Sequence, residues 1–210
     1  MPAALEVYYS LSSPWTYFAW PRLRRLVEHT GAALHLYPIE LGLVFPRTGG
    51  LPLKQRAPAR QAYRLAELRR WRDVLGEPLN IEPRFFPVDS GRAARCAIAL
   101  REAGGPVEPF SFAVLRAIWV EERDAADPST LAALLSEAGA DADATLASAD
   151  DDASAARLTA DSEAAVDHGV FGAPTFRVGE ELFWGQDRLN FVARALGADP
   201  AAVFGRLASA

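Results

Sequence analysis

The pattern of apolar and polar positions at the start of the chain predicts a strand, a helix and a second strand. The strands cover residues 5–9 and 33–39, and the helix between them covers residues 14–28. Two strands joined by a long helix favour a βαβ unit, in which the strands pair in parallel. Residues 44–58 are rich in proline and glycine and predict a loop.

Helical patterns dominate the middle of the chain. The predicted helices cover residues 59–75, 93–103 with a start signal at Asp89-Ser90, 108–122, 128–135, and two segments of 141–166 that divide near 150–152. Residues 80–88 are a proline-rich connection. The stretch 141–166 is rich in alanine and acidic residues, which is typical of a solvent-exposed helix face, so we assign it no functional role.

Strand patterns return near the end of the chain. Residues 175–178 and 181–184 flank Gly179-Glu180 and predict a hairpin, which helices over 188–196 and 201–207 follow. The resulting order of elements is βαβ, then helices, then ββα. It indicates an α/β fold, a thioredoxin-like domain interrupted by an all-helical insertion. We expect the discontinuous domain to comprise residues 1–45 and 170–210, and the insertion to comprise 46–169.

Composition narrows the range of functions. The chain has 210 residues, of which 50% are hydrophobic and 23% charged, and a net charge of -5. These values are typical of a packed globular protein and argue against wholesale nucleic-acid binding. Arginines cluster between Arg47 and Arg72, which leaves room for a local anion site. No apolar run is long enough to span a membrane, and the first residues lack the pattern of a signal peptide. We therefore expect a cytoplasmic protein without membrane contact.

Cys96 is the one cysteine of the chain, so neither an intramolecular disulfide nor a reactive thiol pair can form. This usage suits a reducing compartment, and Cys96 is predicted to be a small buried packing residue. The three histidines, His29, His35 and His168, lie beside helix ends or in a strand pattern. We expect structural or surface roles for them, and we predict no metal site.

The turn between the first strand and the first helix carries the most chemistry. Ser13 fits a helix N-cap, and Pro14 fits the first helical position, where its missing N–H group is not needed. A helix N-terminus has partial positive charge and unpaired N–H groups, so it can stabilise a thiolate. Redox thioredoxin-like proteins carry Cys-x-x-Cys at this turn, whereas this chain has Ser13-Pro14-Trp15-Thr16. Taken alone, the turn is a helix cap.

Three separated motifs change that interpretation: Ser-Pro-Trp-Thr-Tyr at residues 13–17, Val-Phe-Gly-Ala-Pro-Thr-Phe at 170–176, and Trp-Gly-Gln-Asp-Arg-Leu at 184–189. Together they resemble motifs of the 2-hydroxychromene-2-carboxylate isomerases and the related kappa-class glutathione transferases. Both belong to the disulfide-bond oxidoreductase A-like branch of the thioredoxin superfamily. The resemblance covers nearly the whole chain and follows the same order of elements.

The resemblance implies that glutathione is the cofactor. Ser13 would donate a hydrogen bond to the glutathione sulfur, and it would not be a nucleophile, because no histidine-plus-acid relay is evident. Pro174 would be in the cis form, and the backbone of Ala173 would pair with the cysteinyl unit of glutathione. Gln186 and Asp187 would bind the γ-glutamyl unit; Asp187 also fits an ordinary helix N-cap.

The segment from Arg60 to Tyr63 resembles a Lys-x-x-Tyr segment that lines the glutathione site in the family. Arg60 would keep the positive charge and could grip a carboxylate with two hydrogen bonds. A solvated helix arginine is the alternative. Before this segment the family commonly has Gly-Asn, with the asparagine on glutathione, whereas this chain has Gly49-Gly50. The departure would remove one side-chain contact.

The resemblance also places a second, aromatic substrate over the sulfur. Candidates for its aromatic wall are Trp15, Tyr17, Phe45, Tyr63 and Trp71, and Arg92 is a candidate for contact with a substrate carboxylate. Apolar residues at helical spacing also fit a hydrophobic core, so each of these aromatic residues has two interpretations.

The leading functional hypothesis is a glutathione-dependent cis–trans isomerase that acts on compounds like 2-hydroxychromene-2-carboxylate in the breakdown of aromatic molecules. One alternative is a kappa-like glutathione transferase that conjugates electrophiles. Another is a non-catalytic thioredoxin-like binding module. The expected partner is a small aromatic molecule, and a homodimer is an assembly that the resemblance allows.

Overall fold

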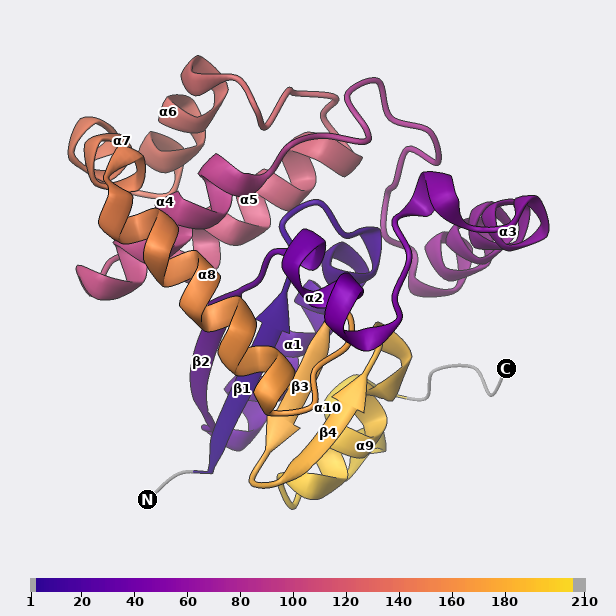
Figure 1. Cartoon of the computed structure of the whole chain (residues 1–210). Helices are drawn as coiled ribbons and strands as arrows, with labels where there is room; N and C mark the ends of the chain where they lie inside the picture. Colours follow the sequence, from indigo (N-terminus) through magenta and orange to yellow (C-terminus); the bar gives the residue numbers. More distant parts are fainter. Residues whose placement is uncertain (1–2, 206–210) are drawn as a thin grey trace.

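The computed structural model describes residues 3–205 and contains a four-stranded mixed sheet covered by helices (Figure 1). The strand order is β2-β1-β3-β4. The strands are β1 (Ala4–Tyr9), β2 (Ala33–Pro38), β3 (Thr175–Val178) and β4 (Glu181–Trp184). β1 pairs with β2 in parallel, as the βαβ pattern predicts, and β3 is antiparallel to both β1 and β4. The predicted fold class, a thioredoxin-like α/β domain with a helical insertion, is confirmed.

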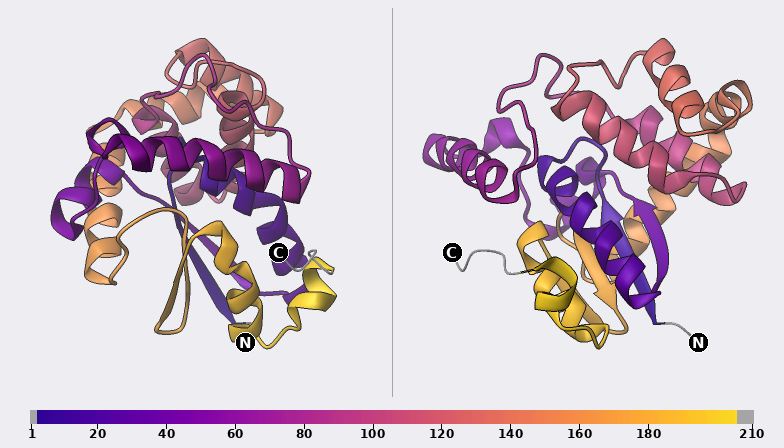
Figure 2. Two further views of the ribbon diagram at one scale, coloured as in Figure 1. Left: turned by 90° about the vertical axis from the view of Figure 1, so that its right-hand side faces the viewer. Right: turned by 180° about the vertical axis from the view of Figure 1, so that it is seen from behind.

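Helices account for most of the remaining chain. They are α1 (Pro14–Thr30), α2 (Leu41–Thr48), α3 (Pro58–Leu75), α4 (Gly91–Glu102), α5 (Val107–Trp119), α6 (Pro128–Glu137), α7 (Ala142–Asp150), α8 (Asp152–Asp167), α9 (Leu189–Ala195) and α10 (Pro200–Phe204). Two 3-10 turns, η1 (Leu53–Gln55) and η2 (Gln186–Arg188), lie in the connections. Helices α4 to α7 lie together at one end of the sheet, and α8 runs from them back along the sheet (Figure 1). Helix α3 lies on the opposite side of the molecule from α6 and α7 (Figure 1 and Figure 2).

Helix α1 forms where the sequence predicts it, and its ends have local causes. The Ser13 hydroxyl oxygen accepts a hydrogen bond from the Thr16 N–H at 3.2 Å, and Pro14 occupies the first helical position. Gly31 ends the helix with φ at 64°, a conformation that glycine adopts without steric penalty. The buried face of the helix includes Phe18 and Leu23, which pack against the sheet and its neighbouring helices.

The prediction of a continuous loop over residues 44–58 is wrong, because α2 covers Leu41–Thr48 and η1 follows it. Pro46 lies inside α2. Val44 is fully buried in a cluster with Tyr8 and Ile39. This packing stabilises a short helix against the local preference of proline and glycine, since tertiary contacts commonly override weak propensities. The final predicted helix, 201–207, begins one residue earlier at Pro200, and residues 206–207 lie outside the described part of the chain.

One cluster of buried side chains extends through both predicted segments of the chain. It includes Leu5 of β1, Leu23 of α1 and Ile118 of α5, and Cys96 of α4 is buried in it as predicted. The helical segment thus shares its core with the sheet, and the domain boundaries at residues 46 and 170 stay a prediction. Within residues 3–205, no helix combines the length and apolar character needed to cross a membrane.

Candidate active site

A cavity of about 600 Å³ lies where several distant segments of the chain meet. Its wall is formed by the start of α1, by α2 with the loop after it, by the first half of α3, and by residues 86–88 and 171–173 with Trp184. Ser13, Arg60 and Ala173, which the family resemblance places in the glutathione site, all line this one cavity. Its position at the end of β1, above the start of α1, follows from the βαβ arrangement.

Ser13 presents a hydroxyl group at the cavity. Its side chain is 7% exposed, and its oxygen accepts the Thr16 N–H. Its own N–H donates to the Ser10 carbonyl at 3.1 Å. Within residues 3–205 no acceptor receives the Ser13 hydroxyl proton, so that proton is free to point toward a ligand. A ligand atom there would also lie at the N-terminus of a 17-residue helix, where the partial charge is positive.

The segment before β3 lines the same cavity as Ser13. The Ala173–Pro174 peptide bond is cis, as the resemblance implies, and Gly172 and Ala173 line the cavity. The segment is held by two hydrogen bonds: the Thr175 hydroxyl donates to the Gly172 carbonyl at 2.7 Å, and the Gly185 N–H donates to the Pro174 carbonyl at 2.9 Å. A second cis bond, Phe86–Pro87, also lies in the cavity wall, and no sequence signal predicted it.

One wall of the cavity is positively charged. Arg56, Arg60 and Arg64 line it. Arg60 and Arg64 lie four residues apart in α3 and therefore share one face of the helix, and Arg56 precedes the helix. No aspartate or glutamate belongs to the described lining of the cavity. Burial lowers the pKa of Arg64 to about 10, which leaves it charged at neutral pH. This wall therefore favours anionic groups in a ligand.

Aromatic rings complete the cavity. Trp15 and Phe45 line it, as the sequence suggests, together with Phe86, Phe171 and Trp184, which sequence reasoning did not assign to the substrate. The rings of Phe171 and Trp184 meet edge to face at 4.8 Å, and Trp184 is 53% exposed. An exposed aromatic pair beside a polar cavity is suited to binding a flat apolar ligand.

A glycine makes the Trp184 position feasible. A side chain at Gly172 would place its Cβ 2.5 Å from Trp184 Nε1, so the indole ring needs glycine there. The Val-Phe-Gly-Ala-Pro motif and the Trp-Gly-Gln-Asp motif thus meet in space. Both motifs belong to the family resemblance, and this was the sequence signal that could have assigned Phe171 and Trp184 to the same site.

Two of the predicted aromatic wall residues belong to the protein core or its margin. Tyr17 is fully buried, its hydroxyl donates to the Pro78 carbonyl at 2.7 Å, and burial raises its pKa to about 12. Trp71 is partly buried and packs against the main hydrophobic cluster. The structure places neither residue on the cavity, because the inward face of each helix here meets other helices.

Tyr63 and Arg92 also lie away from the cavity. Tyr63 is 61% exposed, since it lies next to Arg64 in sequence and therefore about 100° around the helix from it. Arg92 makes a two-pronged ion pair with Asp150, at 2.9 and 2.5 Å. The structure thus brings Trp15 to the cavity and does not bring Tyr17, Tyr63, Trp71 or Arg92 there.

The turn η2 carries the two residues predicted to bind the γ-glutamyl unit. Gln186 is buried, and the Asp187 carboxylate forms an ion pair with Arg188 at 3.0 Å; neither belongs to the cavity lining. Asp187 lies in a 3-10 turn before α9 and caps no N–H group of that helix. The assignment of both residues to glutathione stays a prediction.

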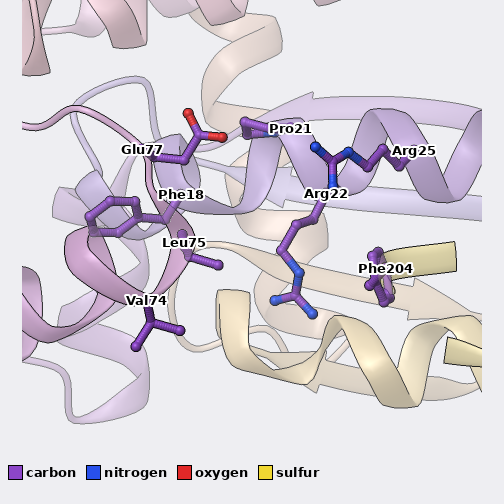
Figure 3. A pocket seen from close by; sticks show the side chains of 8 residues that line it. All are labelled: Phe18, Pro21, Arg22, Arg25, Val74, Leu75, Glu77 and Phe204. Carbon is purple, nitrogen blue, oxygen red and sulfur yellow. The ribbon is translucent and has the colours of Figure 1, made fainter. Parts of the chain in front are cut away.

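Arg22 of α1 fastens this turn to the rest of the site. Its guanidinium donates to the Gln186 carbonyl at 3.0 Å and to the Asn190 side-chain oxygen at 2.9 Å. Figure 3 shows Arg22 extending away from the helix beside Phe204, whose ring centre lies 4.6 Å from the central carbon of its guanidinium, while Arg25 runs along the helix. The small adjoining pocket holds about 70 Å³, too little for a tripeptide. Arg22 therefore links the helix that begins at Ser13 to the turn that carries Asp187.

The space beside Gly50 is occupied by the side chain of Phe45. A Cβ at Gly50 would lie 2.2 Å from Cδ1 of Phe45, so the Phe45 ring takes the space that an asparagine side chain would need. The departure from the Gly-Asn pattern and the position of Phe45 have one steric cause. The cavity has an aromatic surface where the family commonly has an amide.

Comparison with known proteins places the chain among relatives of one fold. Residues 4–197 match the family described as DSBA-like thioredoxin domain. A 2-hydroxychromene-2-carboxylate isomerase from Sphingobium xenophagum is 28% identical, over 91% of this chain and 97% of the relative. One from Pseudomonas putida is 29% identical, over 92% and 94%. Glutathione S-transferase kappa 1 from Rattus norvegicus is 24% identical, over 93% and 92%. A solved structure of a 2-hydroxychromene-2-carboxylate isomerase superimposes with a TM-score of 0.81 and 26% identity, over 92% of this chain and 94% of that chain.

Proposed function

We propose that this chain, which belongs to the DSBA-like thioredoxin domain family, is a glutathione-dependent isomerase that acts on 2-hydroxychromene-2-carboxylate or a similar aromatic 2-oxo acid. The names of the relatives support an isomerase role, and they match this chain over nine-tenths of its length. The observation that carries the proposal is the free hydroxyl proton of Ser13 at the N-terminus of α1, in a cavity that also contains Ala173.

The residues of the cavity fit glutathione. A thiolate needs a hydrogen-bond donor and positive potential, which Ser13 and the start of α1 offer. The two carboxylates of the tripeptide need cationic partners, and Arg60 lines the cavity with no acidic side chain beside it in the described lining. The volume of about 600 Å³ lies within the usual range of roughly 300 to 1,000 Å³ for ligand sites.

Glutathione bound there would supply a thiolate that adds reversibly to the unsaturated carbon of the substrate and leaves after the bond has rotated, with no net oxidation or reduction. Ser13 would hold the sulfur as an anion; a free thiol has a pKa of about 8.5, so only a few per cent is ionised near pH 7 without such help. The rings of Trp15, Phe171 and Trp184 would hold the aromatic part of the substrate and exclude water from it.

The test is the glutathione-dependent change in absorbance when the protein meets 2-hydroxychromene-2-carboxylate. We expect turnover by the wild-type protein and a loss of about 100-fold or more in kcat for Ser13→Ala, because a donor aimed at a developing anion contributes on that order. We also expect the midpoint of the pH–rate profile to move upward in the variant, since the thiol loses its stabilising donor. Ser13→Thr keeps a hydroxyl and should restore part of the rate.

A matched control separates catalysis from helix capping. Asp141 caps α7 through the Ala144 N–H at 3.0 Å, far from the cavity, so Asp141→Ala removes a similar cap. Each substitution should lower the free energy of unfolding by about 1 kcal/mol. Only Ser13→Ala should lower kcat. Equal rates in all of these variants, or no turnover by the wild-type protein, would contradict the proposal.

The rat kappa transferase supports a second candidate, conjugation of glutathione to an electrophile. Mass spectrometry distinguishes the two, because a transferase accumulates the conjugate and an isomerase returns free glutathione. If calorimetry detects no glutathione binding, and Ser13→Ala changes nothing, a non-catalytic binding module remains. Thiol exchange by the protein itself is disfavoured, because burial raises the pKa of Cys96 to about 11 and Cys96 is absent from the described cavity wall.

A further inference from the structure

Arg64 differs from the other two arginines of the cavity wall in the partners available to its guanidinium. Arg56 donates from Nε to the Leu51 carbonyl at 2.8 Å, and Arg60 is exposed, so water can solvate it. Arg64 is half-buried, and within residues 3–205 its side chain has neither an ion pair nor a hydrogen bond to a protein acceptor. The N–H groups of this guanidinium, which face the cavity and have no protein acceptor among these residues, are therefore available to a ligand.

Two aromatic rings hold the Arg64 guanidinium in place. Its central carbon lies 5.2 Å from the centre of the Phe86 ring and 5.8 Å from that of Trp119. These rings contact each other at 4.7 Å, and Trp119 is fully buried, so they form a rigid support. A guanidinium that contacts aromatic rings in this way can still donate its N–H groups to a planar carboxylate.

The surroundings of Arg64 suit an aromatic acid. Phe86, Pro87 and Val88 line the cavity beside it and present apolar surface. A planar ring could lie on that surface while its carboxylate meets the N–H edge of the guanidinium. No carboxylate of the described lining competes for Arg64. Arg92, the candidate that the sequence offered for this contact, is already paired with Asp150.

We propose that Arg64 binds the carboxylate of the second substrate and thereby selects aromatic 2-oxo acids over neutral aromatic electrophiles. Its use as a specificity determinant rests on the proposed function, in which Arg60 serves glutathione. Its capacity to bind an aromatic carboxylate does not rest on glutathione and can be measured alone.

The kinetic test compares Arg64→Met with Arg60→Met, which removes the charge one helical turn away. Two substrates are used: 2-hydroxychromene-2-carboxylate, which carries a carboxylate, and 2-hydroxy-2-methylchromene, a neutral analogue that opens to a methyl ketone and can isomerise in the same way. For Arg64→Met we expect KM for the acid to rise about tenfold or more, as expected for a lost charge-assisted pair. KM for glutathione and for the neutral analogue should change less than twofold. Arg60→Met should show the opposite pattern, with KM for glutathione raised.

The binding test needs no turnover. Calorimetry with cinnamate, an aromatic carboxylate that does not react, should show saturable binding to the wild-type protein. The affinity should fall about tenfold or more in Arg64→Met, and partly recover in Arg64→Lys, which restores the charge without the two-pronged geometry. Circular dichroism and thermal melting verify that each variant is folded, and Arg64→Gln replaces the methionine variant if that one is not.

The outcomes separate this proposal from the proposed function. If the wild-type protein neither binds glutathione nor turns over, the proposed function fails, while the cinnamate titration still judges Arg64. If cinnamate does not bind, or binds Arg64→Met as tightly as the wild-type protein, the role of Arg64 is overturned whatever the activity. The same holds if Arg64→Met raises KM equally for the acid and the neutral analogue.

Discussion

Two arginines in two regions of this molecule, Arg22 buried and Arg64 half-buried, have similarly lowered pKa values but different partners. Burial lowers the pKa of both Arg22 and Arg64 to about 10. At the junction of α1 and η2, Arg22 is 6% exposed and donates to a backbone carbonyl and to the Asn190 side chain. On the α3 wall of the cavity, Arg64 has rings beside it and no acceptor within the described residues.

The difference lies in the partners. A buried charge whose partners are parts of the fold contributes to the structure, because losing it leaves those partners without a donor. A half-buried charge that lines a cavity and has no protein acceptor contributes little to the fold and keeps its N–H groups available for a ligand. We therefore interpret Arg22 as a structural residue that holds the turn of Gln186, and Arg64 as a binding residue.

The largest expected effect on stability follows from Arg22→Met. The substitution removes two hydrogen bonds from a charged donor and leaves the Gln186 carbonyl buried, so we expect a loss of about 2–3 kcal/mol in the free energy of unfolding. Arg64→Met is the matched comparison and should change it by less than about 1 kcal/mol, in either direction. Urea unfolding measures both. Equal losses would erase the distinction between the two regions.

A smaller effect is expected at Tyr17, another buried group whose partner is a backbone carbonyl. Tyr17→Phe should lower the free energy of unfolding by about 1 kcal/mol at neutral pH. Burial raises the pKa of Tyr17 from 10 to about 12 in the folded state. The fold therefore favours the neutral phenol, and this contribution is complete below pH 10 and lost as the pH rises from 10 to 12.

Unfolding experiments across that range check the sign. The stability of the wild-type protein relative to Tyr17→Phe should fall steadily between pH 10 and pH 12. KM for the aromatic substrate should stay unchanged at neutral pH, since Tyr17 lies away from the cavity. A rise in KM without a change in stability would contradict this assignment and indicate that Tyr17 contacts the substrate.

The smallest effect is expected for Arg92→Gln. Its ion pair with Asp150 is partly exposed, and such pairs contribute about 0.2–1 kcal/mol. KM for the carboxylate substrate should be unchanged, in contrast to Arg64→Met. If KM for the acid rises in Arg92→Gln and not in Arg64→Met, the two arginines have been assigned the wrong way round.

Local signals were sufficient for most of the fold. The N-cap at Ser13, Pro14 and the helical spacing after them predicted α1, and alternation around Gly179 predicted the β3–β4 hairpin with its observed bounds. Helix α2 was missed, because Pro46 and two glycines dominate its local signal and the burial of Val44 against Tyr8 depends on contacts distant in sequence.

The candidate site was only partly predictable for a related reason. An aromatic residue at helical spacing has the same pattern whether it enters the core, as Tyr17 does, or a cavity, as Trp15 does. The position of the Phe45 ring beside Gly50 was also visible only in the structure, since the glycine in the sequence indicated only the loss of a side-chain contact. Neighbouring helices decide which side of a helix is packed and which is left open.

By itself, the sequence determined most of the elements, their order and the capped turn at Ser13, because caps and periodic patterns act over a few residues. The tertiary structure alone decided which arginines have partners. Arg22 meets Gln186 across 164 positions of sequence, and Arg92 meets Asp150 across 58. No local pattern encodes such pairs. Whether an arginine stabilises the fold or is available to bind a ligand depends on the hydrogen-bond acceptors near it, and only the folded chain brings those acceptors close.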